Sequence, residues 1–259
     1  MSSSALTLGY DLDKWTAYGI KEPVVVDLSP ATNSHILLCG MSGSGKSYAE
    51  QAILARIVQA QPDSEVWFAD YKGDDSFAYL HNCSRYCTHK QALEALDAVY
   101  GRLTARLSGE DEARHPVILV WDEYMANVLA LIGENAKLAK STMSKVSEIL
   151  LMGRSMSVRL ITSMQRPDAI AFPAGSRLNY GVVIALGAAV RSIYEMLLPD
   201  FKEEVKGRQF GRGEGVALLQ GSKLHFIKIP EIDNFEKVER LCLGALSKPV
   251  LNACEDKQA

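Results

Sequence analysis

The sequence lacks several features that would mark particular classes of protein. Its 259 residues contain no apolar run of the roughly 20 residues that a membrane span needs, and the longest candidate, at 181–190, has about half that length. Five cysteines are scattered along the chain, an odd number that favours a reducing cytosol over a disulfide framework. There is no basic and then apolar leader, no internal repeat and no low-complexity tract. We therefore expect a cytoplasmic protein without a transmembrane segment.

The charge balance excludes little. With 28 Lys and Arg residues against 31 Asp and Glu residues, the formal net charge is −3, which does not itself indicate nucleic-acid binding. A basic patch can still lie within an acidic surface, so nucleic acid is not excluded. Hydrophobic residues make up 47% of the chain, enough for one large core, and strand-like and helix-like segments alternate. The sequence predicts an α/β domain with a mainly parallel, twisted sheet flanked by helices.

The most informative segment is 40–47, which reads G-x-x-x-x-G-K-S, the pattern of a phosphate-binding P-loop. An apolar strand-like segment at 36–39 precedes it and a helix-like run at 48–60 follows it. In this context backbone N–H groups and the helix N-terminus surround phosphates. Lys46 is expected to reach the β- and γ-phosphates of ATP, and Ser47 to hold Mg²⁺. The expected nucleotide-binding residues are Gly40, Met41, Ser42, Gly43, Ser44, Gly45, Lys46 and Ser47.

A second motif ends the apolar strand predicted at 116–121. Asp122 and Glu123 follow that strand, which downstream of a P-loop is the Walker B arrangement. Asp122 is expected to bind Mg²⁺, directly or through water, and Glu123 to polarise the attacking water. A motor ATPase needs such a glutamate, whereas a kinase does not. The two motifs together predict ATP hydrolysis.

Other segments complete the predicted fold. Asn234 is expected to cap a closing helix that runs to about residue 247, after a hairpin that turns at Gly221-Ser222. Further helices are predicted at 90–107, 137–152 and 188–197, and further strands at 24–26, 65–70, 158–163, 180–185, 216–219 and 224–229.

Two further side chains are candidates for the reaction. Gln165 follows the strand at 158–163, and a parallel sheet brings such a residue to the P-loop edge, where its amide can sense the γ-phosphate. Arg154 precedes the same strand and is expected to enter the ATP site of a neighbouring subunit, where it would stabilise charge on the transferred phosphoryl group. Arg177 and Arg191 are alternatives for that role.

Lys137, Lys140 and Lys145 form a basic stretch with Ser141 and Thr142. These lysines could face nucleic-acid phosphates in a central channel. A solvated helix face explains the same pattern equally well, and both interpretations stay open.

Taken together, these segments resemble the FtsK/SpoIIIE-type DNA translocases of the HerA/FtsK group and the related coupling ATPases of conjugative plasmids and transposons. The Leu160–Pro167 run, a strand that leads into Gln-Arg-Pro, is the most telling point. The other points of likeness are the P-loop, residues 70–73 (Asp-Tyr-Lys-Gly), residues 117–123, Arg154, and the glycine-rich segment 211–215 that precedes the hairpin. The likeness covers about residues 24–230.

The resemblance implies a RecA-like fold, a homohexameric ring, double-stranded DNA in the central hole, and hydrolysis at subunit boundaries that drives translocation. Tyr71 departs from the family, which often has proline there. We expect a lead-in segment at 1–22, an FtsK-like motor domain at 23–250 and a flexible tail at 251–259. Without an anchor or an added winged-helix domain, the motor would need a membrane or relaxase-type partner, which favours a conjugative or other mobile element.

Two other functions stay open at this stage. The chain could be an ATPase that drives protein secretion on the same fold, or a nucleotide-dependent assembly partner that moves no DNA. Glu123 and Gln165 favour hydrolysis over a binding module, whereas the net charge of −3 favours the protein-handling alternatives.

Overall fold

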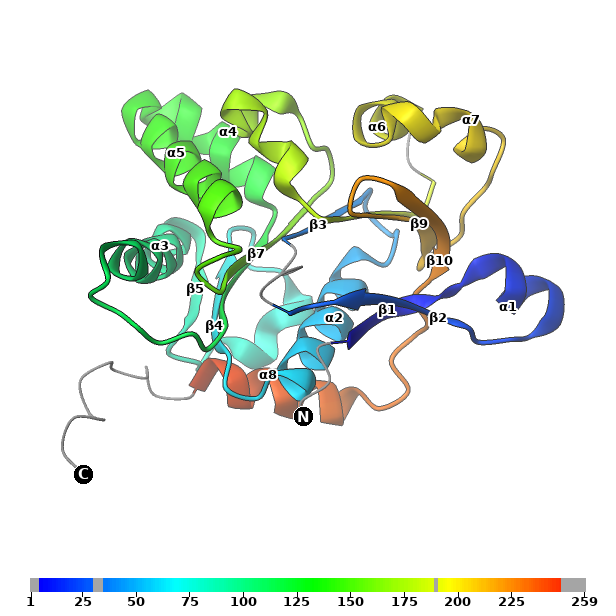
Figure 1. Ribbon diagram of the computed structural model, residues 1–259, viewed down its shortest axis with the longest axis horizontal. Helices are drawn as coiled ribbons and strands as arrows, with labels where there is room; N and C mark the ends of the chain where they lie inside the picture. Colours follow the sequence, from blue (N-terminus) through cyan, green and yellow to red (C-terminus); the bar gives the residue numbers. More distant parts are fainter. Residues whose placement is uncertain (1–4, 30–34, 189–190, 248–259) are drawn as a thin grey trace.

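The computed structural model describes residues 5–29, 35–188 and 191–247, so the predicted tail at 251–259 lies outside the described residues. The strands are β1 (Ala5–Asp11), β2 (Pro23–Asp27), β3 (Ile36–Gly40), β4 (Glu65–Asp70), β5 (Tyr86–Thr88), β6 (Val117–Asp122), β7 (Val158–Met164), β8 (Val182–Leu186), β9 (Glu214–Leu219) and β10 (Lys223–Lys228). The helices are α1 (Leu12–Tyr18), α2 (Lys46–Ala60), α3 (Ala92–Ser108), α4 (Tyr124–Glu134), α5 (Ala136–Met152), α6 (Arg191–Leu197), α7 (Lys202–Val205) and α8 (Phe235–Ser247) (Figure 1).

The strands form one 10-stranded sheet in the order β2-β1-β10-β9-β8-β3-β7-β6-β4-β5. The six strands from β8 to β5 pair in parallel, and β9, β10, β1 and β2 extend the sheet with antiparallel pairs. Because β3 lies between β7 and β8, the P-loop leaves the sheet near its middle. The carboxyl ends of β3, β6 and β7 meet at one edge, which brings the two predicted motifs together.

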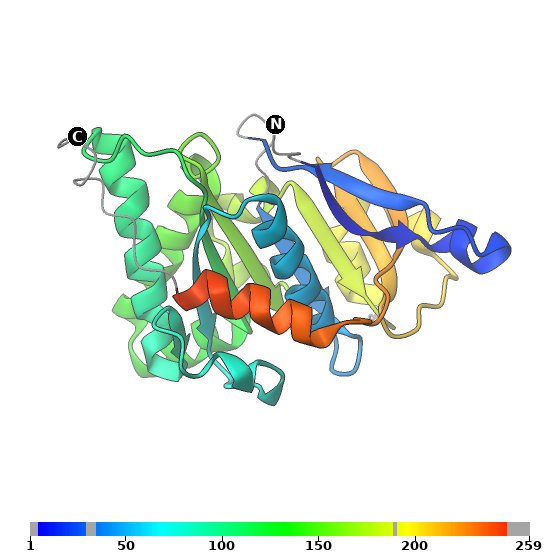
Figure 2. The same ribbon diagram turned by 90° about the horizontal axis from the view of Figure 1, so that it is seen from below.

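Helices cover both faces of the sheet, and the apolar side chains of the central strands alternate between the two layers. Leu37 and Trp121 pack on the side of α3, α4 and α5. Ile36 and Phe68 pack on the other side, under α2 and α8. Figures 1 and 2 show these two layers from perpendicular directions, with α8 lying across α2. Strands buried on both faces are expected to be continuously apolar, as the central ones are here.

The predicted fold class is confirmed, including the mainly parallel sheet, the closing hairpin and the final helix. Asn234 caps α8, since its side-chain oxygen accepts a hydrogen bond from the backbone N–H of Lys237 at 2.8 Å. The hairpin turn lies one residue earlier than predicted: Gln220 and Gly221 hold the positive φ angles, 51° and 66°. These are the two central positions that a tight hairpin turn requires.

Three segments were not predicted as regular structure: the lead-in segment and the residues that form α4 and α7. The lead-in residues form β1 and α1, and β1 pairs with both β2 and β10 inside the main sheet. Helix α4 directly follows the Walker B residues, and β5 is a three-residue strand at the sheet edge. Within the described residues, no helix has the length and apolar character that a membrane crossing requires.

Candidate nucleotide-binding site

The P-loop connects the end of β3 to the first residue of α2, and glycine makes its path possible. Gly43 and Gly45 have φ angles of 81° and 92°, in a region that side-chain-bearing residues rarely adopt. A Cβ atom on Gly45 would also lie 3.1 Å from the backbone nitrogen of Gly213. That nitrogen donates a hydrogen bond of 2.8 Å to the carbonyl of Ser44. The segment before β9 therefore closes against the P-loop.

Lys46 connects the two predicted motifs directly. Its Nζ atom lies 2.9 Å from Oδ1 of Asp122 and 3.1 Å from Oε1 of Glu123, and only 8% of the residue is exposed. Burial lowers the pKa of Lys46, but the charges of Asp122, Glu50 and Glu123 outweigh that effect and raise it above its ordinary value. The ammonium group is therefore positively charged, as a phosphate-binding lysine must be.

Ser163, near the end of β7, supports the Walker B aspartate. Its hydroxyl donates a hydrogen bond to Oδ1 of Asp122 and lies 3.5 Å from Nζ of Lys46. Sequence analysis included Ser163 in the run that resembles the translocase family but gave it no role. The signal was its place two residues before Gln165, on a strand that ends at the P-loop edge.

Glu123 and Gln165 are in contact, as their positions at the ends of β6 and β7 suggested. The amide nitrogen of Gln165 donates to Oε1 of Glu123 at 3.2 Å. Glu123 also has a φ of 53° and a ψ of 40°, a left-handed backbone conformation at the first residue before α4. Such conformations in non-glycine residues cost free energy and concentrate at functional sites. Here it places the carboxylate between Lys46 and Gln165.

Glu50 is a buried carboxylate that sequence analysis missed. It lies one helical turn after Lys46 on α2, is 1% exposed, and neither of its side-chain oxygens has a hydrogen-bond partner among the described residues. Burial, together with the negative charge of Asp122, raises the pKa of Glu50 well above its ordinary value. Both effects disfavour the ionised form of Glu50 in the folded protein.

The loop after β4 forms another wall of the site. Asp70 accepts hydrogen bonds from the backbone N–H groups of Gly73 at 2.7 Å and Asp74 at 2.9 Å, and from the hydroxyl of Tyr86 at 2.6 Å. These bonds fix the loop that carries Lys72. A cavity of about 280 Å³ results, and its lining includes Lys46, Ser47, Lys72, Glu123, Gln165 and Arg212.

These residues fit a nucleoside triphosphate with Mg²⁺. The positive φ of Gly45 and its close approach to Gly213 disfavour a side chain at that position, and the hydroxyl of Ser44 is buried without a hydrogen-bond partner among the described residues. The carboxylate of Asp122 and the hydroxyl of Ser47 are oxygen ligands of the type that Mg²⁺ takes. Lys46, now bonded to carboxylates, is the cation that would turn to phosphate oxygens.

The three candidate arginines differ in their surroundings. Arg154 precedes β7 and is exposed, at the sheet edge opposite the P-loop, so it cannot reach the ATP site of its own chain. Arg177 donates to the backbone carbonyls of Pro167 at 2.6 Å and Met196 at 3.3 Å, which holds it inside its own subunit. The side chain of Arg191 lies outside the described residues.

The three lysines proposed for DNA contact are not equivalent. Lys137 and Lys140 are exposed on α5. Lys145 instead forms an ion pair of 2.6 Å with Asp97 of α3 and lies over the ring of Tyr100. Of these three lysines, Lys137 and Lys140 are the exposed ones.

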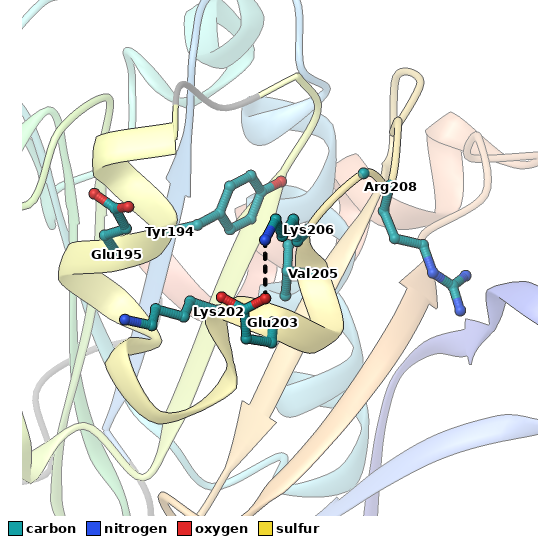
Figure 3. Close-up of a pocket in the computed structure, with 8 residues that line it drawn as sticks. Tyr194, Glu195, Lys202, Glu203, Val205, Lys206 and Arg208 are labelled. Carbon is teal, nitrogen blue, oxygen red and sulfur yellow. Dashed lines mark hydrogen bonds and ion pairs between the residues drawn. The ribbon is translucent and has the colours of Figure 1, made fainter.

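A hollow of about 260 Å³ beside α6 and α7 shares no lining residue with the P-loop cavity (Figure 3). Its charged groups are largely paired: Lys206 bonds Glu203 at 3.1 Å, and Arg208 bonds both oxygens of Asp13. The first pair lies within α7 and the residue that follows it, and the second joins the segment after α7 to α1.

The fold and the site define a P-loop NTPase of the RecA-like class. A family model described as the FtsK/SpoIIIE family matches residues 15–108. The FtsK domain-containing protein YdcQ of Bacillus subtilis (strain 168) is 26% identical in an alignment of 197 residues that covers 69% of this chain and 40% of that protein. The chain is thus similar to the FtsK/SpoIIIE family over part of its length.

Solved structures agree on the fold. The pCW3 conjugation coupling protein TcpA, in its monomer form with ATPγS, superposes with a TM-score of 0.69 at 20% identity over 93% of this chain and 71% of TcpA. The cytoplasmic domain of the type VII secretion ATPase EccC of Thermomonospora curvata gives 0.66 at 18% identity, over 95% of this chain and 31% of EccC. The chain thus spans less than half of YdcQ and of EccC, and the shared part is a P-loop ATPase fold.

Proposed function

We propose that the chain is an ATP-hydrolysing motor that works as a homohexameric ring and translocates double-stranded DNA for a conjugative or other mobile element. The observation that carries the proposal is the cluster of Lys46, Asp122, Glu123 and Gln165 at one sheet edge, joined by hydrogen bonds and ion pairs. A module that only binds nucleotide does not need a carboxylate and an amide beyond the Walker B aspartate.

Each residue of the cluster has a distinct role in this proposal. Lys46 holds the β- and γ-phosphates, and Ser47 and Asp122 hold Mg²⁺. Mg²⁺, when bound, neutralises phosphate charge and stabilises the charge that develops in the transition state. Glu123 accepts a proton from the attacking water. Gln165, bonded to Glu123 in this structure, orients that carboxylate and senses the loss of the γ-phosphate.

In the ring, a neighbouring subunit supplies an arginine that the ATP site of a single subunit lacks. The position of Arg154 at the sheet edge opposite its own P-loop supports an action on the neighbouring subunit. An arginine that acts in this way stabilises charge on the transferred phosphoryl group. The exposed lysines Lys137 and Lys140 are the candidate contacts to DNA phosphates in the central channel. A membrane or relaxase-type partner would bring this cytoplasmic motor to its substrate.

An ATPase that drives protein secretion is the second candidate, favoured by the net charge of −3 and by the ion pair that occupies Lys145. DNA-stimulated ATP hydrolysis separates the two functions. A DNA motor should hydrolyse ATP faster with double-stranded DNA, and that stimulation should fall steeply between about 50 and 200 mM salt, because phosphate contacts release counterions. Hydrolysis that DNA does not change at any salt concentration, with Lys46→Ala as the inactive control, would favour the secretion role.

A further inference from the structure

A second hollow, of about 280 Å³, adjoins the P-loop cavity. Its lining includes Gly45, Tyr48, Arg212, Ile229, Pro230 and Glu231. Three of these residues, Gly45, Tyr48 and Arg212, also line the P-loop cavity, so the two spaces lie side by side at these residues. A ligand whose phosphates lie against Lys46 can therefore extend past Gly45 into the second hollow.

The walls of this hollow are fixed to the P-loop. Gly213 donates its backbone N–H to the carbonyl of Ser44 at 2.8 Å, and its own carbonyl accepts from the backbone N–H of Ile229 at 2.7 Å. The φ of Gly213 is 73°, and a Cβ atom there would lie 2.6 Å from the carbonyl oxygen of Ile229. The approach of these three segments thus requires glycine. This close approach fixes the position of the hollow relative to the P-loop.

Two planar groups lie where the two spaces meet. The guanidinium of Arg212 lies 5.2 Å from the ring centroid of Tyr48, within cation–π range. Tyr48 is 37% exposed, and its ring lies 6.1 Å from that of Phe235, which supports it from α8. An aromatic ring and a guanidinium plane are the surfaces on which nucleobases stack. Ile229 and Pro230 add apolar surface to the same hollow.

Among the charged residues that line the hollow, Glu231 can accept a hydrogen bond from a ligand. Lys228 is already bound to Glu214 at 2.9 Å and lies over the ring of Trp15. Glu231 is exposed and also lines the hollow. A carboxylate accepts hydrogen bonds and cannot donate them when ionised, so it is suited to an exocyclic amino group.

We propose that this hollow is the base subsite of the nucleotide site: a purine base stacks on Tyr48 and Arg212, and Glu231 accepts a hydrogen bond from its exocyclic amino group. The inference rests on the proposed function, because it assumes that the phosphates of ATP occupy the P-loop. It adds a specificity element to that function, supplied by the residue after the P-loop and by the two segments that bracket the closing hairpin.

Equilibrium binding of three probes tests the proposal: ATP, purine riboside triphosphate, which lacks the exocyclic amine, and inorganic tripolyphosphate, which lacks the nucleoside. Wild-type protein should bind ATP most tightly and tripolyphosphate most weakly. Tyr48→Ala and Arg212→Ala should each weaken ATP binding about tenfold, the scale of one lost stacking contact, and leave tripolyphosphate binding unchanged. Glu231→Ala should remove the preference for ATP over purine riboside triphosphate.

Matched variants identify the cause of each change. Tyr48→Phe keeps the ring and should retain ATP binding, and Tyr18→Ala removes an exposed tyrosine outside the hollow and should change nothing. Arg212→Lys keeps the charge but loses the plane, so it should resemble Arg212→Ala. Equal losses for ATP and tripolyphosphate, or wild-type protein that binds both equally, would overturn the base subsite alone. Wild-type protein that binds none of the three probes would overturn the proposed function.

Discussion

The side-chain amide nitrogen of Gln165 lies 3.2 Å from Oε1 of Glu123. The ammonium group of Lys46 contacts the same oxygen at 3.1 Å. One carboxylate oxygen is therefore shared by the residue that would hold the phosphates and the residue that would sense them. If bound phosphates draw Lys46 away, this oxygen keeps Gln165 as its partner, so the contact between Glu123 and the residue after β7 would depend on the state of the nucleotide.

Glu123→Gln should separate binding from hydrolysis. The amide is isosteric but cannot accept a proton from water, so kcat should fall by about 10²–10⁴, the usual contribution of general base catalysis. The affinity for ATP should stay close to that of wild type, because Lys46 and the P-loop are unchanged. Steady-state phosphate release and equilibrium ATP binding measure the two quantities. Glu112→Gln, at an exposed position, is the matched control. Unchanged turnover in the Glu123→Gln protein would remove Glu123 from its role.

Gln165→Ala tests the contact itself. Without the amide, Glu123 loses a hydrogen bond that orients it, so kcat should fall while ATP binding persists. The loss should be smaller than for Glu123→Gln, because the carboxylate is still present. In the double variant Gln165→Ala and Glu123→Gln, the two effects should not add, since both act through one group. Additive losses would mean that Gln165 acts independently of Glu123. Gln59→Ala, at an exposed position of α2, controls for loss of a surface amide.

The parts of the site that sequence analysis predicted share one property: they belong to contiguous motifs. The P-loop, Asp122, Glu123 and Gln165 each follow directly from a recognisable strand, and the rule that parallel strands end at one edge brings them together. Ser163 and Glu50 were missed because neither has a local signature. A serine within a strand and a glutamate within a helix reveal a role only when the fold places them beside Asp122.

The same distinction holds for the fold. Elements with a local sequence pattern were predicted, and elements that depend on other parts of the structure were not. Periodic segments such as α3 and α5 were found near their observed bounds, because burial on one face imposes the spacing. Helix α4 was missed because its start depends on the left-handed conformation of Glu123, which sequence does not show. Strand β1 was missed because its stability comes from pairing with β2 and with β10, and the second partner lies more than 200 residues later in the chain.

Arg154 should act across a subunit boundary. Subunits with Arg154→Ala have an intact P-loop, and subunits with Lys46→Ala have an intact Arg154, so a mixed ring contains some boundaries with both groups. Each variant alone should be inactive, and mixtures should recover part of the ATPase activity, with a maximum at intermediate ratios. Arg177→Ala subunits should not show this complementation, because Arg177 bonds carbonyls of its own chain. No recovery at any mixing ratio would count against an action in trans.

Glu50 should make the folded protein sensitive to pH in a defined direction. Its pKa in the folded protein is raised well above the ordinary value of 4.5, because burial and the charge of Asp122 disfavour the ionised form. Above about pH 4.5 the unfolded chain releases this proton while the folded protein retains it, so the free energy of unfolding falls as pH rises. Glu50→Gln removes the titrating group but keeps the shape, so this contribution to the pH dependence should disappear. Thermal unfolding from about pH 4.5 to about pH 8 should give the variant a higher Tm than wild type at the upper end and a similar Tm at the lower end.

A matched control separates this effect from a general change of charge. Glu110→Gln removes one exposed carboxylate from the loop after α3 and should leave the slope of Tm against pH unchanged. If Glu50→Gln has the wild-type slope, Glu50 is ionised in the folded protein and the pocket floor carries its full negative charge. Lys46 would then be held by three carboxylates instead of two. ATP binding would have to overcome that additional attraction before the lysine could turn to the phosphates.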